Sequence, residues 1–193
     1  MSGDDIGWPA SAAQTEIWLA DRCEPESGRY NVPVALEFLG DLDVPVLRLA
    51  LGDLLARRTE LAGRFDGEDG ELRFCSEPGA PVPLGVSRRT GSCRSDAAHR
   101  EAVRTAERPL DPGTAPLLRA EALLHDDGAL LVLTVHHIVA DGRTLDLVAA
   151  DVITAYRARV AGTPPLAPAP AGVGASTSAP AASASWPRST RTP

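Results

Sequence analysis

The chain has 193 residues, 44% of them hydrophobic and only 4% aromatic, which suits one globular domain with a largely aliphatic core. Its formal net charge of −7 argues against a nucleic-acid-binding protein that relies on phosphate contacts. The cysteines (Cys23, Cys75 and Cys93) include no CxxC pair, so we expect reduced thiols in a cytoplasmic protein and no metal site. The N-terminus lacks an apolar signal core and every apolar run is short, so we expect no membrane partner.

The N-terminal part of the chain predicts a helix followed by a strand. Ser11 and Gln14 have the spacing of a capping box, which predicts a helix through about Asp21. Residues 30–38 alternate apolar and polar side chains, as in a half-buried strand. Pro33 within this strand favours a sheet edge or a bulge, because proline has no amide hydrogen.

The middle of the chain predicts a second helix and then short elements. Asp43 is a suitable N-cap for a helix with leucines on one face over residues 47–55. The next expected elements are short strands around Phe65 and Phe74, separated by a Gly-rich turn at 66–70, and a helix over 95–108.

The clearest unit is a hairpin followed by a helix. Residues 117–124 alternate, HDDG at 125–128 supplies an Asp-Gly turn, and residues 129–136 are almost continuously apolar, as in a strand covered on both faces. An apolar stripe over 145–156 predicts a helix, with Thr144 as its expected N-cap.

Together these elements predict an α/β fold, either α+β or a two-layer α/β sandwich, as one domain over residues 1–160. Residues 161–193 consist mostly of Pro, Ala, Ser, Thr and Gly, with no acidic residue and no apolar periodicity. We expect this Pro/Ala/Ser-rich tail to be disordered, because it cannot bury a core.

The stretch HHIVADG at 136–142 is the strongest functional signal. A histidine at a strand end is suited to general-base chemistry near neutral pH. His136 and His137 point to opposite faces if the strand geometry continues, so only one faces a given cleft. Asp141 could either bond to an imidazole or pair with an arginine and brace the loop, and Gly142 would help the loop to turn.

Other interpretations of the histidines are weaker but open. A histidine at a buried strand end is often only a core residue, and a pair of histidines alone is a weak motif. Adjacent strand residues diverge, which argues against a metal site. The sequence has no GxSxG elbow and no GxGxxG or Walker loop, so serine hydrolase and nucleotide sites are not indicated.

HHIVADG resembles the HHxxxDG active-site motif of the condensation domains of nonribosomal peptide synthetases, within the chloramphenicol-acetyltransferase-like superfamily. Further segments resemble other family motifs in the same order. They are SAAQTEIW (11–18), the strand and helix at 30–51, RRTELAGRF (57–65) and RPLDPGTAPLLRA (108–120). The resemblance covers about residues 8–160 and is far more specific than any one motif.

The resemblance implies amide bond formation between acyl and aminoacyl groups that carrier proteins hold as thioesters. It implies no cofactor of the domain itself, because the phosphopantetheine arms belong to the partner carrier proteins. By resemblance His137 is the catalytic histidine and His136 is structural. Asp141 is the partner of an arginine, with Arg57 as the candidate and Arg58 as its rival; Gly142 is the turn glycine.

Condensation domains have two similar lobes around a tunnel, and the resemblance covers only the N-terminal lobe. We therefore expect the second lobe to be absent and the chain to be weak or inactive alone. Possible partners are a complementing C-terminal lobe or a second copy in a homo-oligomer. Two alternatives stay open: a non-catalytic module that docks carrier proteins, and a stand-alone acyltransferase completed by homodimerisation.

Overall fold

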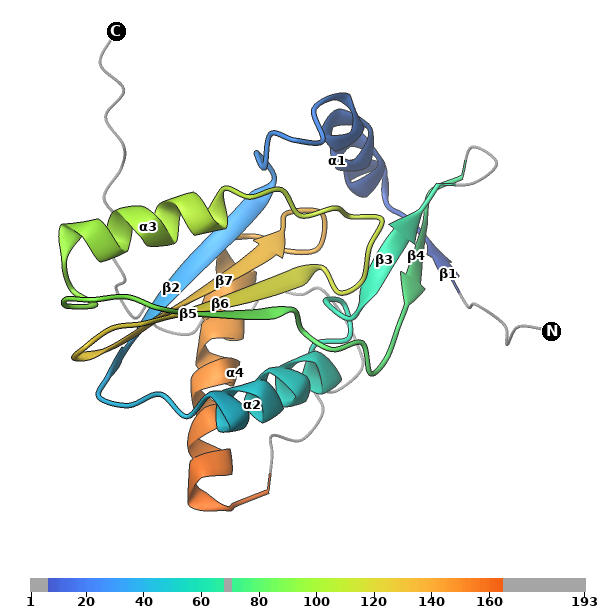
Figure 1. The fold of residues 1–193 in the computed structure, drawn as a ribbon. Helices are drawn as coiled ribbons and strands as arrows, with labels where there is room; N and C mark the ends of the chain where they lie inside the picture. The colour runs from blue at the N-terminus through green and yellow to red at the C-terminus, as the bar shows by residue number, and fades with distance from the viewer. Residues whose placement is uncertain (1–6, 68–70, 165–193) are drawn as a thin grey trace, which may run out of the picture.

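The structure is a computed structural model that describes residues 7–67 and 71–164. Within these ranges the elements follow one another along the chain (Figure 1). They are β1 (Gly7–Pro9), α1 (Ala12–Cys23), β2 (Asn31–Leu39), α2 (Val44–Arg57), β3 (Gly63–Asp66), β4 (Arg73–Ser76), β5 (Leu84–Arg88), α3 (Asp96–Ala106), β6 (Leu118–Leu124), β7 (Gly128–His136) and α4 (Gly142–Ala161). Part of the expected turn at 66–70 and all of the expected tail from residue 165 lie outside the described residues.

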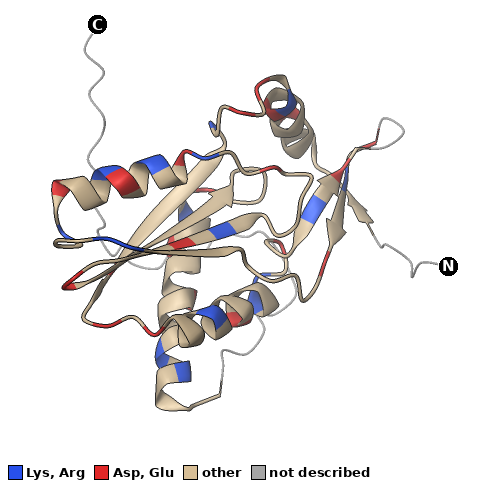
Figure 2. Cartoon of the chain, in the orientation of Figure 1, with Lys and Arg blue, Asp and Glu red and all other residues tan. Residues whose placement is uncertain are grey.

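The larger sheet has the strand order β2-β7-β6-β5. Strand β7 is antiparallel to both of its neighbours, which confirms the predicted hairpin with β6, whereas β5 runs parallel to β6. Every residue of β7 is buried, and the strand contains no Asp, Glu, Lys or Arg (Figure 2). The chain therefore places its most apolar strand at the centre of the sheet.

Strand β2 is at the edge of this sheet, as Pro33 predicts. The carbonyl of Tyr30 accepts from the amide of His137, and the amide of Gly40 donates to Asp127, so the even-numbered residues direct their backbone groups toward β7. Pro33 is odd-numbered, and the amide hydrogen that it lacks would point away from β7. The proline therefore costs the sheet no hydrogen bond.

Helices cover both faces of the larger sheet (Figure 1). Alternate residues of β7 divide between the two faces, since strand side chains have period two. Leu131, Leu133 and Val135 lie in one core with α2 and α4, while Leu130 and Val132 lie in another with α3. The expected α/β class is confirmed, and α3 adds a third layer to the two-layer sandwich that we expected.

The smaller sheet has the order β1-β4-β3 and stands beside α1 (Figure 1). Phe65 of β3 meets Phe74 of β4 edge-on, with ring centroids 5.4 Å apart. Phe65 also packs with Trp18 of α1, Leu117 and Ile138 in a separate buried cluster. Because Ile138 belongs to the HHIVADG segment, this cluster connects α1 and the smaller sheet to the predicted site.

Candidate active site

Of the predicted site residues, His136, His137, Asp141 and Gly142 lie at the end of β7 and in the short loop after it, whereas Arg57 ends α2. Strand β7 ends at His136 and α4 begins at Gly142, so residues 137–141 alone connect them. We call residues 136–142 the histidine loop. Amides within it bond back to earlier carbonyls, from Val139 to His136 at 3.2 Å and from Ala140 to His137 at 3.4 Å. The loop is therefore a compact turn in which each side chain has a defined direction.

His136 is completely buried, which agrees with its expected structural role. Its Nδ1 accepts from the amide of Ile138 at 3.1 Å, so Nε2 must hold the proton of the neutral ring. Nε2 lies 3.5 Å from Oδ1 of Asp21, a residue of α1 that is itself 8% exposed. Burial lowers the pKa of His136, against the opposing influence of the Asp21 carboxylate, so the ring is neutral at pH 7.

His137 is exposed, in contrast to the buried His136. Its amide donates to the carbonyl of Tyr30 at 2.7 Å, which fixes the backbone against the start of β2. Its Nδ1 lies 2.5 Å from the carbonyl oxygen of Ala140. Because a carbonyl can only accept, Nδ1 is the protonated nitrogen, and the lone pair of Nε2 is free to take a proton.

Asp141 is the N-cap of α4, a role that we had expected for Thr144. Its Oδ1 accepts from the amide of Thr144 at 2.8 Å and from the Thr144 hydroxyl at 2.9 Å. These two hydrogen bonds lower the pKa of Asp141. Asp141 thus fixes where the loop ends and the helix begins. Within the described part of the chain, its carboxylate accepts no hydrogen bond from His136 or His137.

The expected ion pair between Asp141 and Arg57 is wrong for this structure. Arg57 Nε donates to Oδ1 of Asp151 at 3.1 Å, and Arg58 Nε donates to Oδ2 of the same residue at 2.8 Å. Asp141 and Asp151 are ten residues apart on α4, about 15 Å along the axis at 1.5 Å per residue. The arginines at the end of α2 therefore meet the middle of α4, not its first turn.

Gly142 lies at the end of the histidine loop, where we predicted that it would help the chain to turn. It is the first residue of α4 and is not among the glycines with positive φ. A Cβ at this position would meet no atom within 4 Å. The space above the first turn of α4 is therefore open, and the loop turns without left-handed backbone at this glycine.

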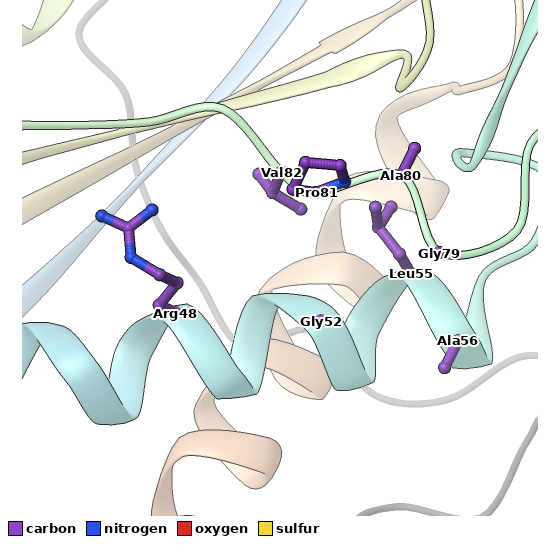
Figure 3. Close-up of a pocket in the computed structure, with 8 residues that line it drawn as sticks. All are labelled: Arg48, Gly52, Leu55, Ala56, Gly79, Ala80, Pro81 and Val82. Atoms are coloured by element: carbon purple, nitrogen blue, oxygen red, sulfur yellow. The ribbon is translucent and has the colours of Figure 1, made fainter.

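A cavity of about 240 Å³ lies away from the histidine loop, between α2 and residues 79–82 (Figure 3). Arg48 is the only charged residue among those that line it. The cavity offers no base or nucleophile, so we do not place the site there. Within residues 7–67 and 71–164, no group of three or more His, Cys, Asp or Glu side chains is arranged to hold a metal ion.

Sequence reasoning missed two acidic residues that lie against predicted site residues, Asp21 near His136 and Asp151 beside Arg57. Asp21 lies at the end of the predicted first helix, seven residues after Gln14, a spacing that places both on one helix face. That spacing was a signal that could have linked Asp21 to the motif. Asp151 lies on the predicted last helix, but its partners Arg57 and Arg58 are more than ninety residues away in sequence.

Comparison with known proteins identifies the family. The sequence model described as Condensation domain matches residues 7–171, and the chain therefore belongs to the condensation-domain family. It is 35% identical over 167 residues to a linear gramicidin synthase of Brevibacillus parabrevis, covering 84% of this chain and 2% of that protein. It is 36% identical over 171 residues to phosphinothricin tripeptide synthetase PhsC of Streptomyces viridochromogenes, covering 84% and 16%. The chain thus spans only a small part of the length of these relatives.

Solved condensation domains share the fold. The first condensation domain of the calcium-dependent antibiotic synthetase, in complex with a substrate analogue, is 30% identical with a TM-score of 0.74, covering 85% of this chain and 40% of that one. The starter condensation domain of rhizomide synthetase RzmA is 27% identical with a TM-score of 0.72, covering 84% and 40%. The match to less than half of each domain fits one lobe, as the sequence predicts for the N-terminal lobe.

Proposed function

We propose that this chain provides the N-terminal lobe of a condensation site that joins carrier-tethered acyl and aminoacyl groups through an amide bond. The observation that supports this most directly is the ring of His137. Its Nδ1 is engaged by the Ala140 carbonyl and the residue is exposed, which would leave Nε2 to act as the proton acceptor. A neutral imidazole fixed in this tautomer is suited to act as a general base near pH 7.

In the proposed reaction the amine of the aminoacyl group attacks the carbonyl carbon of the acyl thioester. A C–N bond forms, the C–S bond breaks, and Nε2 of His137 takes the proton that the nitrogen loses. The same proton passes to the departing thiolate, so the products are an amide and a free thiol. A positioned base contributes about 10²- to 10⁴-fold to such a step, and correct orientation of the two thioesters contributes more.

We propose carrier proteins as the partners, since both acyl groups would arrive on their phosphopantetheine arms and the lobe itself would need no cofactor. The chain covers about 40% of the solved condensation domains, and we propose that a complementing second lobe or a second copy supplies the remaining wall of the tunnel. None of the three cysteines forms a disulfide, which agrees with the proposed cytoplasmic location. No helix in the described part of the chain has the length and hydropathy needed to cross a bilayer.

The test is amide formation by purified chain supplied with an acyl-loaded and an aminoacyl-loaded carrier protein. The reaction is run with the chain alone and with a separately expressed second lobe of a related condensation domain. We expect little or no product without the second lobe, product when it is added, and loss of that product in His137→Ala. His99→Ala, which alters an exposed histidine of α3, is the matched control.

Product that is insensitive to His137→Ala would contradict the proposed role of this residue. Carrier binding that survives His137→Ala, with no product under any condition, would contradict catalysis and favour a docking module. Product from the chain alone, appearing with the concentration dependence of a dimer, would favour a site completed by a second copy.

A further inference from the structure

The N-terminal motif SAAQTEIW has no role in the chemistry described so far, yet its helix contacts the histidine loop at several points. We propose that Gln14, Trp18 and Asp21 form a bracing face on α1 that positions the histidine loop, and that His137 depends on it for its reactive tautomer. This inference rests on the proposed function, in which Nε2 of His137 is the base.

The three residues share one face because they are spaced by four and three positions along α1. Each one contacts the residue on one side or the other of His137. Gln14 Nε2 donates to the carbonyl of Ile138 at 3.2 Å. Trp18 packs with the Ile138 side chain in a buried cluster. Asp21 Oδ1 lies 3.5 Å from Nε2 of His136.

The orientation of the Gln14 amide is fixed by the start of its own helix. Gln14 Oε1 accepts from the amide of Ser11 at 3.0 Å, and the Gln14 amide donates to the Ser11 hydroxyl at 3.2 Å. With its oxygen engaged in this capping box, the side-chain nitrogen of Gln14 is directed to Ile138. One glutamine thus connects the cap of α1 to the histidine loop, which accounts for the Ser-x-x-Gln spacing within the motif.

His136 is contacted from two sides, by a hydrogen bond on one and by a nearby carboxylate on the other. The amide of Ile138 donates to its Nδ1, and its Nε2 lies 3.5 Å from Oδ1 of Asp21 without a hydrogen bond among the described residues. The bracing face therefore fixes His136 through its ring and Ile138 through its carbonyl and side chain. His137 lies between them, and its ring reaches the Ala140 carbonyl only when the backbone holds this turn.

The test measures the tautomer of His137 in the full chain by nitrogen-15 NMR of the imidazole rings, with His137→Gln used to assign its signals. In the unmodified chain we expect a single Nδ1–H tautomer. Gln14→Glu keeps an acceptor for the Ser11 amide but removes the donor to Ile138. We expect this variant to lose the single tautomer and to show a mixture of Nδ1–H and Nε2–H forms.

Asp21→Asn gives a second, independent readout and preserves the size of the side chain. Weaker restraint of His136 should speed hydrogen exchange of the Ile138 amide, which donates to that ring, by roughly fivefold to tenfold, the equivalent of about one net hydrogen bond. Glu16→Gln, on an exposed position of the same helix, should change neither readout. Thermal unfolding of each variant identifies any general loss of structure.

A folded Gln14→Glu variant with the original tautomer of His137 would refute the bracing role, as would unchanged Ile138 exchange in Asp21→Asn. If Gln14→Glu does not fold, the Asp21→Asn exchange rate alone decides the question. Neither NMR readout requires turnover. Failure of the proposed function would instead appear as amide formation that does not depend on His137, so the two ideas fail separately.

Discussion

Replacing Asp141 distinguishes the helix cap seen in the structure from the ion pair that the family resemblance implied. As an exposed N-cap with two hydrogen bonds to Thr144, Asp141 should contribute what such caps usually do. Asp141→Ala should then lower the free energy of unfolding by about 1 kcal/mol. For a chain of this size that corresponds to a fall in Tm of about 2–4 °C.

Asp141→Asn is the informative variant, because asparagine caps helices about as well as aspartate but has no charge. We expect it to change the free energy of unfolding by less than about 0.5 kcal/mol. Breaking a buried ion pair would instead cost about 3–5 kcal/mol with either substitution. Urea unfolding followed by circular dichroism separates these cases.

A double-mutant cycle with Arg57→Gln completes the test. Asp141→Asn and Arg57→Gln should be additive within about 0.5 kcal/mol, since the two residues do not share a hydrogen bond. The matched control is Asp151→Asn with Arg57→Gln, a pair joined at 3.1 Å, which should show a coupling of about 0.5–3 kcal/mol. A loss above about 2 kcal/mol in Asp141→Asn, or coupling of Asp141 to Arg57, would refute the capping interpretation.

Three further predictions concern β7 and the histidine loop that follows it. His137→Ala should lower the free energy of unfolding by about 1 kcal/mol or less, since one hydrogen bond of an exposed ring is lost, and should abolish the amide formation seen with the added second lobe; a large fall in Tm would contradict this. Burial lowers the pKa of His136 in the folded chain. The free energy of unfolding should therefore be unaffected by this residue above about pH 6.5, and should fall as the pH drops from there toward the pKa of the folded state. Urea unfolding from about pH 8 to pH 5 should show this slope, and a slope unchanged in His136→Gln would assign it to another group. Leu131→Ala, at a side chain with 0% exposure, should cost about 2–5 kcal/mol in urea unfolding, and a loss below about 1 kcal/mol would mean that the core there is loosely packed.

Where the deciding contacts are local, sequence reasoning predicted the fold well. The capping box of Ser11 and Gln14 and the N-cap at Asp43 are present as expected, because both depend on residues three positions apart. The 117–136 hairpin follows from an alternating strand, an Asp-Gly turn and an apolar strand. Strand β5 was missed, because a short strand at a sheet edge has little periodicity to detect.

The candidate site was predicted less completely, for a physical reason. Strand geometry predicts different surroundings for His136 and His137, and in the structure His136 is buried while His137 is exposed. The partner of Arg57 depends on how α2 crosses α4, which no local rule provides, so sequence reasoning named Asp141 and missed Asp151. Asp141 and Thr144 are both residue types that cap helices, and they lie three positions apart. The choice between them depends on where the helix begins, which the sequence does not fix.

Strand β2 has a consequence for the order in which the molecule folds. It pairs with β7 along its whole length, although the partners are about a hundred residues apart in sequence. At about 5–20 residues per second, β2 leaves the ribosome several seconds before β7 exists. The hairpin of β6 and β7 can close locally first, but His136 ends β7 opposite Asn31 and the His137 amide bonds to Tyr30. We therefore expect the geometry of His137, the proposed base, to be completed late, when β2 docks onto β7.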